Sequence, residues 1–166
     1  FTLPGAVPFT WQRTYRSGNA NNIGLGHGWT HSGSDKIHLK HDRVDYFDEE
    51  GRCITLQCPQ VGQESRYIPE GLALIRNNKQ SFILKQKGKF DKVFTAVSSS
   101  GSFYRLTQIR HSQYQPSQDS KTPSIGFALQ LHYNSQGQLS RLKSNWGKTL
   151  QFKRNEHGQI QSISLI

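Results

Sequence analysis

The sequence lacks methionine altogether and contains only two cysteines among its 166 residues. Two cysteines cannot build the disulfide framework that stabilises many small secreted domains. No apolar run approaches the roughly 18 consecutive residues of a membrane-spanning helix, and no basic segment followed by an apolar one resembles a signal peptide. Because the chain opens on Phe1 and stops within the apolar run 163–166, we expect an excerpt of a longer polypeptide.

Acidic residues are also scarce, and they are unevenly placed. Residues 1–70 carry 7 basic and 8 acidic side chains, whereas residues 71–166 carry 14 basic and 3 acidic ones, a net charge of +11. This asymmetry raises the hypothesis of a polyanionic partner. Only 33% of the residues are hydrophobic, but the 3 Trp, 6 Tyr and 9 Phe argue against disorder.

Alternation of apolar and polar residues with period two is widespread, and no window shows helical periodicity. The clearest case is residues 125–133, where Ile, Phe, Leu, Leu and Tyr fall on one face. Such alternation predicts strands, so we expect an all-β fold: an extended antiparallel sheet of hairpins with about a dozen strands. Residues 111–124 are polar and contain two prolines, which predicts a surface loop.

The chain contains an internal repeat. Residues 134–142 and 155–163 align at an offset of 21, with Asn, Gly, Gln and both apolar positions coinciding, and residues 48–56 and 98–106 are weaker copies. An Asp, Asn or Ser side chain caps a turn, and a Gly three positions later adopts a left-handed conformation. Each copy therefore predicts a type I turn followed by Gly, which connects two strands of a hairpin.

Two stretches resemble a known family. The sequence Tyr133-Asn134-x-x-Gly137-x-Leu139 resembles the YD repeat of bacterial Rhs proteins and teneurins. Residues 3–17, which read LPGxVPFxWxRxYxS, and residues 24–29, which read GxGxGW, resemble the module that precedes the YD repeats in Rhs polymorphic toxins. The second repeat departs from the family pattern, because Arg154-Asn155 stands where Tyr-Asp is usual.

The resemblance implies a bacterial, non-enzymatic chain that forms part of a hollow shell, or β-cocoon, enclosing a C-terminal toxin. Residues 1–130 then form the pre-repeat module and residues 131–166 the first YD-repeat hairpins. The implied partners are the rest of the shell, the toxin and proteins of a type VI secretion apparatus; we expect no membrane span and no nucleic acid. The implied location is the cytoplasm before export, and then the outside or a target cell.

The motifs single out residues with structural roles. They are Trp11, Arg13, Tyr15, Gly26, Gly28, Trp29, Gly51, Gly137 and Gly158. Alternation places Arg13 on the same face as Trp11 and Tyr15, so this charge needs a hydrogen-bonding partner, a carboxylate or an aromatic ring to stack on. We interpret Arg13 as an anchor that ties the first strand to a loop.

We expect no metal, cofactor or catalytic site. His27, His31, Cys53 and Cys58 just meet the spacing of zinc ligands, but Cys53 occupies an apolar position of the repeat and is interpreted as a small core residue. The acidic residues 48–50 lie within a predicted turn, where exposed acids are common. The glycines at 24–28 are interpreted as a tight turn, because no helix follows them.

One alternative stays open, namely a binding module that recognises a glycan or polyanion through the basic C-terminal half. Four lysines between residues 85 and 92 are candidate contacts: Lys85, Lys87, Lys89 and Lys92. With Phe90 among them they resemble a single-strand binding patch. They are equally typical of a solvated hairpin tip that discourages edge-to-edge aggregation.

Overall fold

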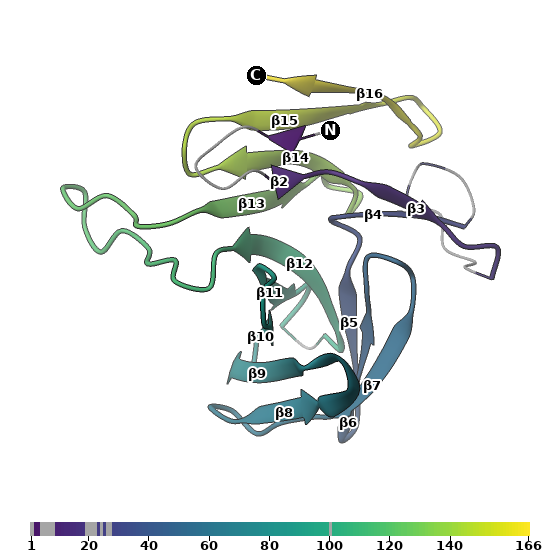
Figure 1. Cartoon of the computed structure of the whole chain (residues 1–166). Coiled ribbons are helices and arrows are strands. Elements are labelled where there is room, and N and C mark those ends of the chain that lie inside the picture. The colour runs from purple at the N-terminus through teal and green to yellow at the C-terminus, as the bar shows by residue number, and fades with distance from the viewer. Residues whose placement is uncertain (1, 4–8, 19–22, 24, 26–27, 100) are drawn as a thin grey trace.

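A computed structural model of the chain describes residues 2–3, 9–18, 23, 25, 28–99 and 101–166. These residues form strands, turns and one 3-10 turn, η1 (Ile68–Glu70), so the all-β prediction is confirmed (Figure 1). The strands are β1 (Thr2–Leu3), β2 (Phe9–Thr10), β3 (Arg13–Tyr15), β4 (Trp29–His31), β5 (Lys36–Lys40), β6 (Arg43–Phe47), β7 (Cys53–Gln57), β8 (Glu64–Tyr67), β9 (Leu72–Asn78), β10 (Ser81–Gln86), β11 (Asp91–Ala96), β12 (Phe103–Arg110), β13 (Ala128–Tyr133), β14 (Leu139–Ser144), β15 (Thr149–Arg154) and β16 (Ile160–Leu165).

Strands β5 to β12 form an antiparallel meander that curls back on itself. The first half of β12, Phe103–Arg105, pairs with Lys36–His38 of β5. The second half, Gln108–Arg110, pairs with Ala128–Gln130 of β13. Strand β12 is therefore a branch point, from which one path runs through β5 to β7 and another through β13 to β16 (Figure 1).

The curled part is an incompletely closed barrel with an apolar interior. Its strands place alternate side chains inward, because successive residues of a strand point to opposite faces. These inward residues are buried: Ile37, Val44, Tyr46, Ile54, Leu56, Leu72, Leu74, Phe82, Leu84, Phe94, Tyr104 and Leu106. Full burial of one such side chain stabilises the fold by about 1.5–3 kcal/mol.

Side chains bridge the opening of the barrel, where no ladder among the described residues joins β7 to β8. At one end, Arg52 Nη1 lies 2.7 Å from Glu70 Oε1. At the other, Arg76 Nη1 donates to Cys58 Sγ over 3.5 Å. These contacts hold the two edges near one another without a backbone ladder.

The branch β13 to β16 continues the same 12-stranded sheet above the barrel, and the N-terminal strands lie against it (Figure 1). We call this branch the upper sheet. Trp11 lies 5.2 Å from Phe152 of β15, ring centroid to ring centroid. Phe90, at the end of the barrel, contacts both Phe9 and Phe127. The barrel and the upper sheet consequently share one hydrophobic core.

Most strands lie where alternation predicts them, and residues 111–124 lie in the connection between β12 and β13 (Figure 1). The connection extends to residue 127, because β13 begins at Ala128 and the predicted strand position Ile125 is exposed. Two differences stand out. The alternation that places Trp11, Arg13 and Tyr15 on one face predicts a continuous N-terminal strand, but residues 11–12 separate β2 from β3. Strand β8 was not predicted, because its Glu-Ser-Arg-Tyr sequence has little apolar character. In the described part of the chain, no helix is long and apolar enough to cross a membrane.

Candidate functional site

The predicted repeat produces the same turn at three of its four copies. At the fourth, the Gly101 N–H also donates to the Ser98 carbonyl, but Gly101 does not adopt the expected left-handed conformation. The three turns begin at Asp48, Asn134 and Asn155, and in each the N–H of the residue three positions later donates to the first carbonyl over 3.0 Å. That later residue is Gly51, Gly137 or Gly158, with φ of 80°, 76° and 76°. A positive φ of this size is disfavoured for residues with a Cβ, which explains why glycine recurs at this position.

The first side chain of each turn caps it, as the repeat predicts. Asn134 Oδ1 accepts hydrogen bonds from the N–H groups of Gln136 and Gln138 at 3.0 and 2.9 Å. Its Nδ2 donates to the Gln138 side chain over 3.0 Å, and Asn155 makes the equivalent contact with Gln159 over 2.9 Å. The repeated Gln therefore holds the cap in place.

The copy at Asp48 uses an ion pair where the others use two amides. Asp48 Oδ1 accepts from the N–H groups of Glu50 and Arg52, and its Oδ2 lies 2.7 Å from Arg52 Nε. Asp48 is buried and Glu49 half-buried, so the prediction that the acids at 48–50 are all exposed is wrong. A further turn at Ser144, closed by Gly147 with φ 85°, is not one of the repeat copies, because its apolar residues are differently spaced.

The N-terminal motif residues divide between core and surface. Trp11 is buried and lies 4.5 Å from the His31 ring. Arg13 and Tyr15 are exposed and both contact the ring of Trp29, at 5.0 and 5.3 Å. The prediction that Arg13 shares a buried face with Trp11 is wrong, because the break between β2 and β3 changes the alternation. The expected stacking on Trp29 is present.

Glycine 28 is required by close packing as well as by its backbone. Its φ is 83°, and a Cβ placed there would lie 2.6 Å from Tyr15 Cε2 and 2.9 Å from the Arg16 carbonyl oxygen. No other residue type fits this position without displacing β3. Gly26 and His27, which the sequence also singled out, lie outside the described residues.

The four candidate lysines do not form one exposed patch. Lys87 and Lys89 are exposed at the tip of the β10–β11 hairpin, as a solvated tip predicts. Lys85 Nζ lies 2.8 Å from Asp91 Oδ2. Lys92 is turned into the barrel, where its Nζ lies 2.8 Å from Asp35 Oδ2 and only 18% of its side chain is exposed. Two of the four are thus engaged by carboxylates.

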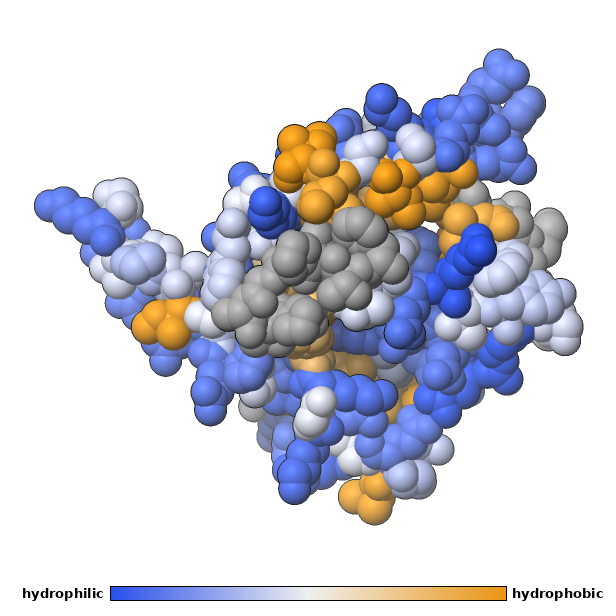
Figure 2. All heavy atoms as spheres, turned by 45° about the horizontal axis from the view of Figure 1, so that its top comes forward, coloured by the Kyte–Doolittle hydropathy of each residue, from blue (hydrophilic) through white to orange (hydrophobic). Residues whose placement is uncertain are grey.

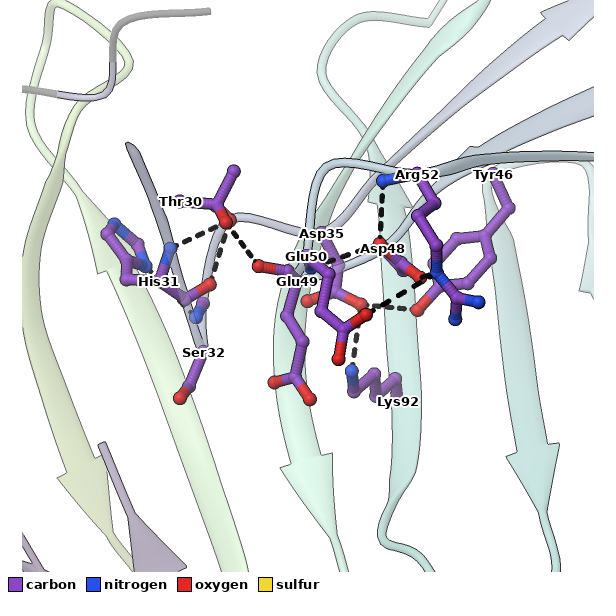
Figure 3. A network of polar contacts seen from close by, with 12 residues as sticks. Thr30, His31, Ser32, Asp35, Tyr46, Asp48, Glu49, Glu50, Arg52 and Lys92 are labelled. Atoms are coloured by element: carbon purple, nitrogen blue, oxygen red, sulfur yellow. Dashed lines mark hydrogen bonds and ion pairs between the residues drawn. The ribbon is translucent and has the colours of Figure 1, made fainter. Parts of the chain in front are cut away.

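The contact of Lys92 belongs to a polar network at one end of the barrel, which we call the Asp35 cluster: Asp35, Tyr46, Glu49 and Lys92 (Figure 3). Tyr46 on β6 donates its hydroxyl hydrogen to the same Asp35 Oδ2 that Lys92 contacts. The Asp35 side chain is fully buried, and its Oδ1 has no hydrogen-bond partner among the described residues. An unpartnered buried carboxylate oxygen is costly and calls for an explanation.

The charged groups of the Asp35 cluster shift the pKa values of Lys92, Tyr46 and Glu49. Burial lowers the pKa of Lys92, but the carboxylates of Asp35 and Glu49 outweigh burial and raise it overall. Burial, followed by the charge of Asp35, raises the pKa of Tyr46 well above its usual value. Burial also raises the pKa of Glu49, against the opposing effect of Lys92. A cavity of about 230 Å³, lined in part by Tyr46, Glu49 and Lys92, opens beside the cluster.

The sequence contained one signal for Lys92. It lies between Phe90 and Phe94 with period two, which places it on an apolar face of the strand. Its partner was not predictable, because Asp35 lies 57 residues earlier and meets it only after the meander has closed.

The predicted zinc-like spacing does not produce a metal centre among the described residues, where no group of three potential ligands occurs. Cys53 is exposed and Cys58 half-buried. The interpretation of Cys53 as a core residue is wrong, because it lies on the outer face of β7 while Ile54 and Leu56 face inward. His31 is buried against Trp11 instead.

A family model matches the N-terminal part of the chain. The model of a domain of unknown function (DUF6531) matches residues 1–56, about a third of the chain. The matched segment contains Trp11, Asp35, Tyr46 and the turn at Asp48, whereas Lys92 lies outside it. No curated protein matches the chain.

Proposed function

We propose that this chain is a non-enzymatic wall segment of an Rhs-type YD-repeat shell, which encloses a C-terminal toxin and helps to deliver it through type VI secretion. Its partners are then the remainder of the shell, the toxin and secretion-apparatus proteins. Two features support the proposal. The family match covers the N-terminal stretch that resembles the Rhs pre-repeat module, and the Asn-x-x-Gly turns recur in successive hairpins.

The observation that carries the proposal is the incomplete edge at β16. Among the described strands, β16 pairs only with β15. Ile163 and Leu165 lie opposite the buried Phe152 and Leu150, on the core face of the sheet. Yet they remain 40% and 44% exposed, and apolar residues gather along this rim of the molecule (Figure 2).

An exposed, apolar strand edge invites pairing with another strand. Because side chains on its core face are only partly covered, β16 is suited to continue the sheet rather than to end it. In the proposed shell, a strand of the next YD hairpin pairs with β16 and covers Ile163 and Leu165, in the same way that β15 pairs with β14.

The test is made on the complete polypeptide that we propose contains this chain. Electron microscopy is expected to show a closed hollow particle, and the toxin inside it should resist added protease. The variant Leu165→Pro removes one pairing N–H at β16 and should leave the particle open and the toxin digestible. Ser120→Pro, in the exposed loop 111–124, is the control and should close normally. A solid or extended particle with a freely digestible toxin would overturn the proposal.

A second candidate function, binding of a glycan or polyanion, is favoured by the outer face of β13 to β15. Residues 128–154 contain no acidic side chain. Arg141, Lys143 and Lys153 are exposed there, and none of the ion pairs in the described part of the chain involves them. Burial, then the charges of Arg141 and Lys143, lowers the pKa of His132 beside them.

Heparin is a suitable probe of this second candidate. Binding should weaken steeply as salt rises, because counterions are released from the polyanion. The double variant R141E/K143E should abolish it, whereas K87E/K89E carries the same charge change at the β10–β11 tip and should bind nearly as the unaltered chain does. Equal losses in both variants would indicate an effect of net charge alone.

A further inference from the structure

We propose that Lys92 and Asp35 condense to form an intramolecular isopeptide bond, which joins β11 covalently to the segment preceding β5. The inference does not depend on the proposed function. It rests on a lysine that alternation places inside the barrel and on the buried carboxyl group that it meets there (Figure 3).

The register of the strands explains why Lys92 points inward. Lys92 lies opposite Leu84 on β10 and opposite Ile109 on β12. Both neighbours are buried core residues, and cross-strand partners share a face of the sheet. Lys92 therefore occupies a core position of β11, and its side chain runs along the apolar interior to the barrel end.

At that end, the amine and the carboxyl group are already in contact. Lys92 Nζ lies 2.8 Å from Asp35 Oδ2, the carboxyl group is fully buried, and Asp35 Oδ1 has no partner in the part of the chain that the structure describes. Reacting groups held at about 3–3.5 Å in a fixed geometry behave as if present at very high effective concentration. Contact brings the two groups together, and exclusion of water favours a condensation that releases water.

The condensation balances without any other reactant. The ammonium proton first moves from Nζ to Asp35 within the contact, which gives a neutral amine and a neutral carboxylic acid. The amine lone pair attacks Cγ, so that the Nζ–Cγ bond forms and the Cγ–Oδ2 bond breaks. Oδ2 departs with the carboxyl proton and one proton from Nζ, as a single water molecule, and Oδ1 remains as the amide oxygen.

Two neighbours are placed to assist. The Tyr46 hydroxyl donates to Oδ2, the oxygen that leaves, and so stabilises negative charge that develops on it. Glu49 lines the same cavity as Lys92, and both Lys92 and Asp35 affect its pKa, which burial raises. A carboxyl group with a raised pKa can accept and return the proton that passes from Nζ to the leaving oxygen.

Burial also favours the product. The ion pair holds two charges in an apolar environment, with one carboxylate oxygen unpaired, and such a pair repays its desolvation poorly. The amide is neutral, so its formation removes both charges and reduces the cost of the unpartnered oxygen.

The chain contains a matched pair in which the same reaction is not expected. Lys85 Nζ also lies 2.8 Å from a buried carboxylate, that of Asp91, but 42% of the Lys85 side chain is exposed, compared with 18% for Lys92. Solvent reaches Lys85 more freely, and water at the contact opposes a condensation that releases water. The two pairs have the same chemistry and distance and differ mainly in exposure.

The test is the intact mass of the purified, folded chain. The expected mass is one water below that of the sequence. Trypsin should then release residues 17–36 linked to residues 90–105, because the modified Lys92 is no longer cleaved. An unaltered mass in a chain whose circular dichroism shows a folded β protein would overturn the proposal.

Two conservative variants identify the lysine that forms the isopeptide bond. Lys92→Arg keeps the positive charge beside Asp35 but cannot form the amide, so its mass should equal that of its own sequence. Lys85→Arg alters the matched pair and should still lose one water. Loss of water in Lys92→Arg, or a linked peptide that contains Lys85 in place of Lys92, would contradict the assignment.

Discussion

At the scale of single residues, Asn134 shows how one side chain sets a hairpin turn. Its Oδ1 accepts two backbone hydrogen bonds, so Asn134→Ala leaves both N–H groups without this partner. We expect the free energy of unfolding in urea to fall by about 1 kcal/mol, the usual net value of such contacts. Asn134→Asp retains an oxygen and should lose less than half as much. Equal losses in the two variants would mean that the Oδ1 acceptor is not the source of the stabilisation.

A second residue, His31, makes stability depend on pH. Burial, aided by the charge of Arg154, lowers the pKa of His31 to about 3, from about 6.5 in an unfolded chain. Between these values the unfolded state binds the extra proton, so stability falls as pH falls below about 6.5, by up to about 1.4 kcal/mol per unit.

The test of this dependence compares His31→Asn with the unaltered chain between pH 6.5 and 5, where carboxyl groups contribute little. The Asn side chain can replace Nδ1 as the acceptor for the Gly33 N–H, but it does not titrate. Urea unfolding should therefore show a shallower pH slope in the variant. Parallel slopes in the two chains would place the titration elsewhere.

The turn residues and the Asp35 cluster differ in how much the sequence reveals. The caps at Asn134 and Asn155 are local, so the order of Asn, Gly and Gln predicts them. Lys92 and Asp35 meet because β12 pairs with β5, and no local pattern encodes that closure. The prediction of a buried Arg13 was wrong for a related reason. The break at 11–12 interrupts the alternation, so that the Arg13 side chain faces outward.

At the scale of elements, β16 is the strand most exposed to association. Ile166 and Thr149 exchange both backbone hydrogen bonds, and hydrogen-bonded and free pairs alternate along an antiparallel ladder. Ser164 therefore bonds to β15, whereas the N–H of Leu165 faces the free edge. A proline is tolerated where the N–H faces away from the sheet.

Ser164 and Leu165 are therefore matched positions for a proline substitution, because they are neighbours on β16 and their N–H groups face opposite edges. We expect the chain to self-associate as its concentration rises, and Leu165→Pro to remain a monomer of nearly unchanged stability. Ser164→Pro removes a ladder hydrogen bond and should lower the free energy of unfolding by about 1–3 kcal/mol. Size-exclusion chromatography with light scattering, together with urea unfolding, distinguishes them. A chain that is monomeric at every concentration would argue against β16 as a pairing edge.

At the scale of the whole molecule, the shared strand β12 determines whether the barrel and the upper sheet unfold together. Alternation predicted a sheet of hairpins, and the sheet is present, but one strand serving two neighbours on the same edge has no signature in the sequence. The branch is possible because β12, Phe103–Arg110, is long enough for each half to pair with a different strand. Since the cores are continuous across it, the two parts are expected to behave as one cooperative unit.

Leu74→Ala tests this cooperativity from the far side of the barrel. Leu74 on β9 is fully buried, and its truncation should cost about 2–5 kcal/mol. If unfolding is cooperative, hydrogen exchange of the slowest amides in β14 should accelerate by the factor that corresponds to this loss, although β14 does not pair with β9. Faster exchange confined to β8, β9 and β10 would show instead that the upper sheet folds as an independent unit and that β12 joins the two parts without coupling them.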